Sequence, residues 1–426
     1  MSIKWIVLVL AVLMYTLIVI FPDKKSFSSL GAAIVMILLG AVSPQEALTE
    51  LVNWNVLLIF VGSLVIAELF IYSRVPAVIA DSIVTHSPNV GLAVVAILIM
   101  TGLISAFVEN VATVLVMAPI ALALCTKLKM DPTYFMVGLA VMANLQGTAT
   151  LVGDPPSMIF ADHAGYSFND FFIYQGKLSI FFVVQAGMAA GAVFFYAFFV
   201  KSGKQKIDIE QETVLTMVPT ALLILMIGGL ALASFVYGGI SLFSGLLVMG
   251  LGLAGIIWYK WIRGEPNEKI WALVKGLDWD TVLFLTGIFV VVGAVAAVGL
   301  LDEFAAFLSR LVGDRVFLGF FLIVGVSTLI SGFVDNVPYI VAMLPVASTL
   351  AADLSLKPEL YMFALLIGSC MGGNLTPFGA SANVVSVGLL RKQGVRMNFG
   401  QWLRIGLPFT LVTTGVSAAF IWLIWS

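Results

Sequence analysis

Long apolar stretches separated by short polar segments run along the whole chain. A helix needs about 20 residues to cross about 30 Å of hydrocarbon, and ten stretches reach or approach that length. They lie at roughly 4–21, 27–43, 54–72, 133–161 and 178–200, and at 214–236, 241–259, 281–300, 359–390 and 403–425. This pattern predicts an all-α polytopic membrane protein.

Two further apolar segments, about 88–125 and about 316–352, have a polar centre. The first contains Glu109-Asn110 and the second contains Asp335-Asn336 near its middle. A charged side chain in the middle of a straight transmembrane helix is costly, so such residues face protein or water. We therefore predict that each segment is a re-entrant hairpin, in which two short helices meet at a polar tip.

A second kind of interruption follows each hairpin. Glycine and proline, which both disrupt helices, cluster at 147–157 and again at 373–383. Backbone groups freed at membrane depth are tolerated only where they line a cavity or coordinate a ligand. The segments about 133–163 and about 359–391 are therefore predicted to be broken helices that form a site near the middle of the bilayer.

These features occur twice in the chain. The segment 331–345 is similar in sequence to the segment 105–119, 226 residues earlier, with Asp in place of Glu in the acid-Asn pair. Trp54 and Trp279 repeat with nearly the same spacing. The chain is thus divided into a first repeat at 1–200, a cytoplasmic linker at 201–212 and a second repeat at 213–426. Each repeat has about five crossings, an odd number, so the second repeat is predicted to be inverted relative to the first.

Basic residues are unevenly distributed between the predicted loops. With the N-terminus outside, five of the 21 Lys and Arg residues lie outside and the other sixteen lie inside; the five are Lys4, Lys177, Arg310, Arg315 and Lys357. Positive charge is favoured on the cytoplasmic side. The distribution therefore places both termini outside and the linker inside, in what we expect to be a prokaryotic inner membrane.

The composition excludes several classes of protein. Apolar residues make up 61% of the chain and charged residues 10%, which excludes a soluble domain. The net charge of −2 gives no indication of a nucleic-acid partner. The chain has neither the Gly-x-x-x-x-Gly-Lys-Ser/Thr motif for ATP nor the His/Cys spacing of a metal site. Cys125 and Cys370 lie in apolar segments, which favours packing roles over a disulfide.

The hairpin acid-Asn pairs and the sequence Gly-Thr-Ala-Thr-Leu-Val-Gly-Asp-Pro-Pro at 147–156 resemble those of the ion transporter superfamily. This superfamily includes arsenite permeases, the melanosomal P protein, D-type sodium/proton antiporters and, more distantly, the divalent anion/sodium symporters. Asn110 and Asn336 match hairpin-tip asparagines that contact ion and substrate in the symporters. Those symporters have Ser-Asn-Thr at each tip, whereas here an acid precedes each asparagine and a valine follows it. The resemblance also implies a homodimer in the lipid bilayer.

The predicted site combines the hairpin tips with the two breaks. Glu109, Asp335 and Asp154 are expected to couple ion and solute movement, because an arriving cation stabilises the charged form of a carboxylate in a dry site. The resemblance implies a sodium ion at Asn110, Gly153, Asn336 and Gly379. A proton is the alternative coupling ion, and no other cofactor is expected. The remaining expected site residues are Thr113, Asn144, Gly147, Thr148, Thr150, Asn374, Thr376, Ser381 and Asn383.

Broken helices and intramembrane acids indicate transport. We expect a secondary active transporter that moves a small inorganic or organic anion by alternating access, driven by protons or sodium. A sodium/proton antiporter and an arsenite efflux permease are alternatives with the same fold. A channel is disfavoured, because an inverted repeat provides two opposed half-gates. An enzyme with Glu109 and Asp335 as a catalytic acid pair is also disfavoured, because it leaves the broken helices unexplained.

The topology can be tested by cysteine labelling. Ser202→Cys, in a variant without Cys125 and Cys370, should react with a membrane-impermeant maleimide only after the cells are permeabilised. A control cysteine at Gln175, beside the externally predicted Lys177, should react in intact cells. Labelling of Ser202→Cys in intact cells would contradict the predicted orientation.

Overall fold

The protein is almost entirely helical. The structure, a computed structural model, describes residues 3–21, 24–200, 212–237 and 242–426. The predicted linker at 201–212 lies outside the described residues except for Glu212. The first repeat contains α1 (Ile3–Ile20), α2 (Lys25–Leu38), α3 (Pro44–Glu46), η2 (Ala47–Leu51), α4 (Trp54–Tyr72), α5 (Val75–His86), α6 (Val90–Ser105), α7 (Asn110–Leu128), α8 (Thr133–Gly147), α9 (Pro155–Ala164), η3 (Asn169–Phe171), the antiparallel pair β1 (Ile173–Tyr174) and β2 (Lys177–Leu178), and α10 (Ile180–Phe199).

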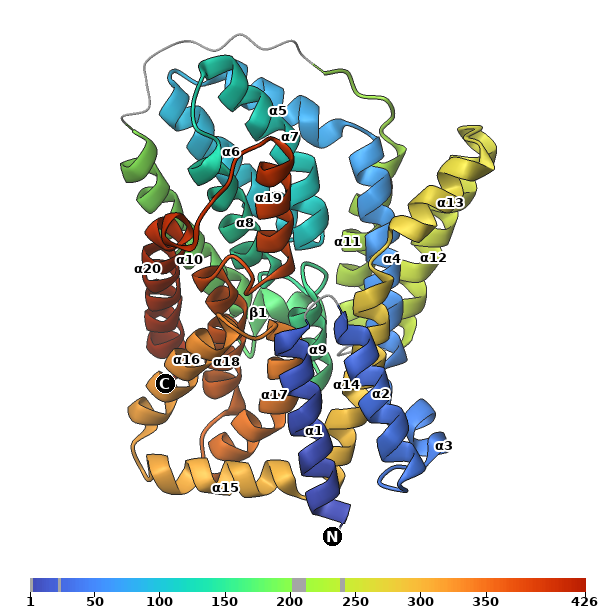
Figure 1. The fold of residues 1–426 in the computed structure, drawn as a ribbon, viewed down its shortest axis with the longest axis vertical. Coiled ribbons are helices and arrows are strands. Elements are labelled where there is room, and N and C mark those ends of the chain that lie inside the picture. Colours follow the sequence, from blue (N-terminus) through green and yellow to red (C-terminus); the bar gives the residue numbers. More distant parts are fainter. Residues whose placement is uncertain (1–2, 22–23, 201–211, 238–241) are drawn as a thin grey trace.

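The second repeat follows the same order of main helices, but its described residues include no counterpart of η3, β1 and β2. It contains α11 (Val218–Tyr237), α12 (Leu242–Ile257), η4 (Trp258–Ile262), α13 (Asn267–Gly276), α14 (Trp279–Ala297), α15 (Leu300–Val312), α16 (Val316–Ser331), α17 (Asn336–Asp353), α18 (Pro358–Gly372), η5 (Gly373–Leu375), α19 (Ser381–Lys392) and α20 (Phe399–Trp425). The equivalent helices α5 and α15 lie at opposite ends of the molecule (Figure 1). The predicted all-α fold of two inverted repeats is therefore confirmed.

The predicted hairpins and breaks appear as separate helices. The segment at about 88–125 consists of α6 and α7, and that at about 316–352 consists of α16 and α17. The broken helices are α8–α9 and α18–α19. Among the described residues, eight helices are long and apolar enough to cross a membrane, namely α1, α4, α7, α10, α11, α12, α14 and α20. That each hairpin enters and leaves on one side of the membrane remains a prediction.

One predicted crossing is shorter in the structure. The apolar stretch at 27–43 forms α2, which ends at Leu38. Gly40 takes a left-handed φ of 73°, which an α-helix does not accommodate. Ser43 then caps a new helical turn, because its side chain accepts a hydrogen bond from the backbone N–H of Glu46 at 3.1 Å. The helical run is therefore interrupted before it reaches the predicted length.

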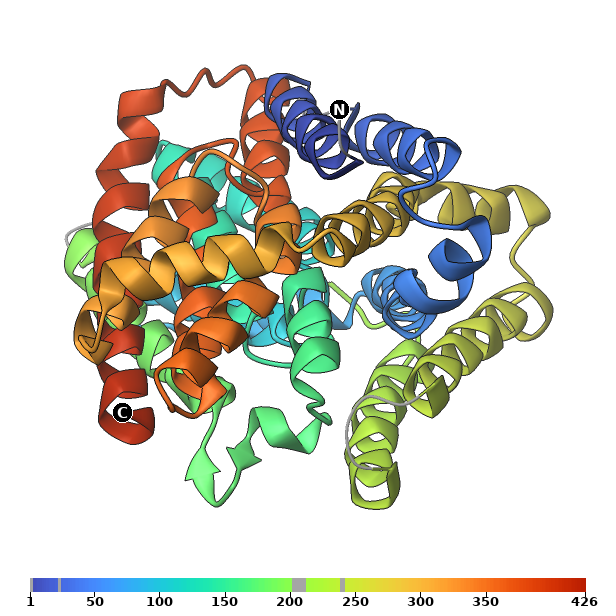
Figure 2. The ribbon, with the colours of Figure 1, turned by 90° about the horizontal axis from the view of Figure 1, so that it is seen from below.

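The helices of the two repeats are sorted into two bundles (Figure 2). Helices α1–α4 and α11–α14 form one group, here called the side bundle, and α6–α10 with α16–α20 form the other, here called the site bundle. In the side bundle, α2 packs against α14 and α12 packs against α4. In the site bundle, α8 packs against α19 and α9 against α17. In the side bundle each repeat thus packs mainly against the other, whereas packing within one repeat, such as α6 against α8 and α16 against α18, predominates in the site bundle.

Two equivalent glycines allow the close packing of the side bundle. A Cβ on Gly62 of α4 would lie 2.7 Å from the backbone of α12. A Cβ on Gly287 of α14 would lie 2.6 Å from the backbone of α2. Small residues let helix backbones approach in this way, and van der Waals packing is a principal attraction between helices in lipid. Any larger residue at either position must push the two helices apart.

Matched contacts also begin the two long helices. Asn53 accepts a hydrogen bond from the third residue of α4 at 3.0 Å, and Asp278 accepts one from the third residue of α14 at 2.9 Å. The indoles of Trp54 and Trp279 each donate to a backbone carbonyl of the preceding helical turn at 2.7 Å. The repeated tryptophan therefore fixes how the chain enters each long helix.

The glycine contacts predict a specific loss of stability. Gly62→Ala and Gly287→Ala should each destabilise the protein by about 1–3 kcal/mol, as overpacking of a tight interface does. Gly250→Ala is the control, because a Cβ at Gly250 of α12 meets no atom within 4 Å. Thermal unfolding in detergent should show a lower Tm for the first two variants only. Equal Tm values for all three would contradict the proposed role of the close approach.

Candidate functional site

A small cavity lies where the hairpin tips, the helix breaks and the side bundle meet. Its volume is about 40 Å³. The side bundle contributes Lys25, Phe60, Asp278 and Thr281, and the site bundle contributes Glu109, Asn110, Asn144, Asp154, Pro155, Asp335, Asn336, Val337, Ala380, Ser381 and Ala382. The hairpin tips of both repeats therefore share one cavity.

Six helices begin at this cavity, namely α2, α7, α9, α14, α17 and α19. Four have an acid as their N-cap residue: Glu109 for α7, Asp154 for α9, Asp278 for α14 and Asp335 for α17. Lys25 is the first residue of α2. Each helix N-terminus carries about half a positive charge, so six of them and one ammonium roughly offset four ionised carboxylates. The site is therefore close to electrically balanced when all four acids are ionised.

In the first repeat, Asn110 ties the hairpin tip to the break. Its Oδ1 accepts a hydrogen bond from Ser105 Oγ at 2.7 Å, and its Nδ2 donates to Asp154 Oδ2 at 3.0 Å. Asn110 and Asp154 are 5% and 7% exposed, so these are interior contacts. Glu109 accepts a hydrogen bond from the backbone N–H of Ala112 at 2.9 Å. The orientation of the Asn110 amide is thus fixed by the protein.

The second repeat is arranged differently at the equivalent positions. Asp335 accepts a hydrogen bond from the backbone N–H of Val337 at 3.1 Å and forms an ion pair with Lys25 at 3.2 Å. Ala380 stands where the first repeat has Asp154, so the bond between Asn110 and Asp154 has no counterpart. Among the described residues, none forms a hydrogen bond with the side chain of Asn336, which lines the cavity. In the second repeat, the Asn336 amide therefore faces the cavity without a hydrogen-bond partner among the described residues, and helix α19 begins without an acidic N-cap residue.

Matched threonines hold the two breaks in place. Thr150 donates its hydroxyl to the carbonyl of Ala106, and Thr376 donates to the carbonyl of Gly332. Both carbonyls lie just beyond the first helix of a hairpin, at equivalent positions of the two repeats. Both threonines are buried. Each break is therefore attached to the hairpin of its own repeat by a contact that also satisfies a buried carbonyl.

Matched glycines make the breaks compact. A Cβ on Gly153 would overlap the carbonyl oxygen of Gly147, and a Cβ on Gly379 would lie 2.6 Å from the carbonyl oxygen of Gly373. In both repeats the chain therefore folds back onto the end of the preceding helix. Only a residue without a side chain fits there.

Asn144 joins the two repeats at the breaks. Its Nδ2 donates to Asn374 Oδ1 at 2.9 Å and to Asn383 Oδ1 at 2.8 Å. Asn383 in turn donates to the carbonyls of Gly373 and Thr376, both at 2.9 Å. All three asparagines are buried. This network fixes the second break against α8 of the first repeat.

The predicted site residues fall into two groups. Seven line the cavity: Glu109, Asn110, Asn144, Asp154, Asp335, Asn336 and Ser381. The other nine lie around it: Thr113, Gly147, Thr148, Thr150, Gly153, Asn374, Thr376, Gly379 and Asn383. Thr113 donates to the carbonyl of Val108 at 3.3 Å and closes the hairpin tip. Thr148 is fully buried, and Gly379 lines a larger cleft beside the cavity, which is described below.

The four residues expected to bind sodium are not equally placed. Asn110 and Asn336 line the cavity, whereas Gly153 and Gly379 lie beside the carbonyls of the breaks. A sodium ion at these residues remains a prediction. Within the described part of the chain, no group of three or more His, Cys, Asp or Glu side chains is close enough to hold a metal ion.

Sequence reasoning missed the residues that the side bundle contributes. Lys25, Asp278 and Thr281 line the cavity, although the sequence placed Lys25 in a cytoplasmic loop. A signal for Asp278 was available, because Asp-Trp-Asp at 278–280 repeats Asn-Trp-Asn at 53–55 with two acids in place of two amides. No sequence signal indicated that Lys25 lies beside Asp335, 310 residues away.

A larger cleft adjoins the small cavity. Its volume is about 750 Å³, and it shares Lys25, Asp278, Thr281, Asp335, Ala380 and Ser381 with the small cavity. Ile18 and Val19 of α1, Phe333 and Val384 contribute apolar walls. The small cavity therefore has space beside it for a ligand of many atoms.

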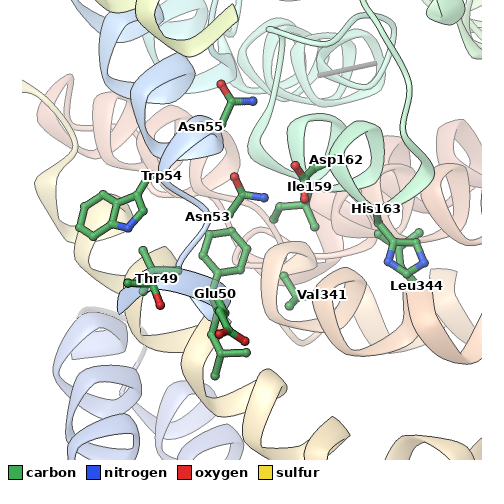
Figure 3. Close-up of a pocket in the computed structure, with 13 residues that line it drawn as sticks. Thr49, Glu50, Asn53, Trp54, Asn55, Ile159, Asp162, His163, Val341 and Leu344 are labelled. Atoms are coloured by element: carbon green, nitrogen blue, oxygen red, sulfur yellow. The ribbon is translucent and has the colours of Figure 1, made fainter. Parts of the chain in front are cut away.

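A separate cavity of about 430 Å³ lies between the start of α4 and the end of α9 (Figure 3). Asn53 and Asn55 line it from α4, and Asp162 lines it from α9. The inverted repeat relates this cavity to the cleft, because Asn53 and Asn55 are equivalent to Asp278 and Asp280 of the cleft. The carboxylates of Asp278 and Asp280 in the cleft thus correspond to the amides of Asn53 and Asn55 in this cavity.

Comparison with known proteins identifies the family. The sequence profile described as "Citrate transporter" matches residues 15–368 and 272–426. The chain belongs to this family. An uncharacterised transporter of Mycobacterium tuberculosis is 30% identical over 418 residues, with 96% of each chain covered. The human P protein is 24% identical over 477 residues, which cover 92% of this chain and 56% of the P protein.

Solved structures support the fold. The YdaH transporter of Alcanivorax borkumensis, described as having an unusual topology, aligns with a TM-score of 0.61 over 99% of this chain and 98% of its own, at 16% identity. MtrF of Neisseria gonorrhoeae, described as illuminating a class of antimetabolite efflux pumps, aligns with a TM-score of 0.56 over 91% of this chain and 83% of its own, also at 16% identity. Membership of the citrate transporter family and the likeness to curated transporters make this protein a membrane transporter, not an enzyme.

The unequal hydrogen bonding of the two tip asparagines predicts unequal effects of substitution. Asn336→Ala should abolish transport and leave the Tm unchanged, because its side chain has no protein partner among the described residues. Asn110→Ala should abolish transport and also destabilise the protein by about 1–3 kcal/mol, because Asp154 and Ser105 lose their buried partner. Solute uptake in proteoliposomes and thermal unfolding would measure the two effects. Wild-type uptake by both variants would show that the tips serve only the fold.

Proposed function

We propose that this protein is a secondary active transporter that moves a small carboxylate anion of the citrate type, with sodium or protons as the coupling cation. The observation that carries the proposal is the pairing of a small, acid-lined cavity with a large cleft that shares Lys25 and the start of α19. Membership of the citrate transporter family supports the class of substrate.

The size of the small cavity favours a single ion within it. A cavity needs about 10–15 Å³ of space to hold one water molecule, so about 40 Å³ suits an ion with one or two water molecules rather than a polycarboxylate. Glu109, Asn110, Asp154 and Asn336 line it. Carboxylate and amide oxygens suit a hard cation such as sodium.

The anion is better placed in the cleft. Lys25 supplies a positive charge there beside the carboxylates of Asp278, Asp280 and Asp335. Helix α19 begins at Ser381 with Ala380 as its N-cap. A helix N-terminus without an acid is a favourable place for an anion. The cleft of about 750 Å³ accommodates a tricarboxylate.

Electrostatics links the two ligands. With four carboxylates roughly offset by Lys25 and six helix N-termini, a cation that enters the small cavity leaves the site with a net positive charge. That charge attracts the anion into the neighbouring cleft. Because each ligand improves the binding of the other, the two are expected to move together.

A sodium/proton antiporter is the second candidate. The small cavity has four acids and a volume suited to one cation, which is sufficient for exchange without an anion. Currents measured on a solid-supported membrane would distinguish an anion symporter from a sodium/proton antiporter. An anion symporter gives currents only when citrate or a related carboxylate is added in the presence of its cation. An antiporter responds to sodium and pH gradients when no anion is present.

The coupling acids can be tested with isosteric amides. Glu109→Gln and Asp335→Asn should retain anion binding, because shape and hydrogen bonding are preserved, but should lose the dependence of uptake on a sodium or pH gradient. Glu303→Gln is the control, because Glu303 pairs with Lys4 far from the cavity. Gradient-driven uptake in proteoliposomes is the measurement. If both amide variants accumulate anion as the wild type does, these acids are not the coupling groups.

A further inference from the structure

Lys25 occupies an unusual position for a basic residue. It is the first residue of α2, and its ammonium lies 3.2 Å from Asp335 Oδ2 and 5.2 Å from the centre of the Phe284 ring. The side chain of Lys25 is 12% exposed and that of Asp335 is 22% exposed. An ion pair this far from solvent is screened little by salt. Lys25 is also the cationic side chain that lines both the small cavity and the cleft.

The ion pair joins the two bundles. Lys25 belongs to the side bundle through the packing of α2 against α14, whereas Asp335 is the tip of the α16–α17 hairpin in the site bundle. A nearby contact fixes the start of α2, since Ser26, the second residue of α2, donates to Asp280 of α14. In addition, Tyr15 of α1 donates to the carbonyl of Pro338 in α17 at 2.9 Å. The ammonium is therefore held at the cavity rather than free to turn away.

Only one of the two equivalent acids has such a partner. Glu109 is the counterpart of Asp335, and in the described part of the chain it forms no salt bridge. The two tips thus differ in charge, although they share one cavity. A cation that enters the cavity finds Glu109 without a counter-ion and Asp335 already paired.

We propose that Lys25 is a built-in competitor for the coupling cation at Asp335. This inference rests on the cation coupling proposed above. The ammonium fills the place of the cation when the cavity is empty, and an arriving sodium ion or proton displaces it from Asp335. Displacement breaks this ion pair between the tip of the α16–α17 hairpin and the side bundle and leaves the Lys25 charge in the cleft, where it faces the anion.

Removing the competitor should strengthen cation binding. In Lys25→Met, the sodium concentration that half-saturates the rise in Tm should fall about tenfold at constant ionic strength, which corresponds to about 1.4 kcal/mol. If the coupling ion is a proton, the midpoint of the stability change should rise by about one pH unit instead. The other titratable groups that face Asp335 are Glu109, Asp154 and Asp278 across the small cavity and Asp280 across the cleft, and they are unchanged in this variant.

Three further variants complete the test, which uses purified full-length protein and thermal unfolding in sodium or choline chloride. Lys25→Gln removes the charge and keeps a hydrogen-bond donor, so it should shift the response as Lys25→Met does. Lys25→Arg keeps the charge and should respond as the wild type does. Lys4→Met removes the surface ion pair with Glu303 and should leave the sodium response unchanged.

The outcomes separate this proposal from the one on which it rests. If Lys25→Met and Lys25→Gln respond to sodium and pH at the wild-type midpoints, Lys25 does not compete with the cation, while cation coupling stands. If the wild type responds to neither sodium nor pH, the cation coupling fails, and the role of Lys25 fails with it.

Discussion

The centre of this protein depends on one constraint: polar backbone exposed by a helix break within the bilayer must be satisfied by the protein itself. Both breaks meet this constraint in the same way. Thr150 and Thr376 satisfy carbonyls beyond the hairpin helices, and Asn383 satisfies two carbonyls of the second break. Because these partners come from the hairpins and the breaks themselves, satisfying the backbone also places the hairpin tips beside the broken helices. The geometry of the cavity is thus a consequence of how the breaks are stabilised.

Much of this arrangement could be predicted from the sequence, because it depends on residues that are close together along the chain. Apolar stretches predicted the helices, the acid-Asn pairs marked where α6 meets α7 and α16 meets α17, and the Gly/Pro clusters marked where α8–α9 and α18–α19 are interrupted. The repeat related the two halves and predicted their inversion. Asn110 and Asn336 were predicted as equivalent, but the structure gives them different surroundings, because Asp154 is replaced by Ala380 in the second repeat. A sequence repeat therefore predicts that the two halves share a fold, but a single substitution between them, such as Ala380 for Asp154, changes the hydrogen bonds at the site.

What could not be predicted comes from packing between bundles. Lys25 meets Asp335 only because α2 packs against α14 and the start of α14 reaches the α16–α17 tip. No pattern within α2 encodes that contact. The charge balance was also hidden, since each of the four acids stands at the N-cap position of a helix. Carboxylates at helix N-termini are stabilised by the helix dipole, so their number alone says little about whether the site rejects an anion.

In the side bundle, helices of the first repeat pack against helices of the second, and this has a consequence for how the chain assembles. Helix α4 is inserted during synthesis of the first repeat, yet the helix it packs against, α12, is made only after residue 242. Until then, the backbone at Gly62 faces lipid or the insertion machinery. The first repeat therefore cannot reach its final packing alone, and the newly made half must wait in the membrane for the second. The packing of α4 therefore depends on a helix that is more than 160 residues further along the chain.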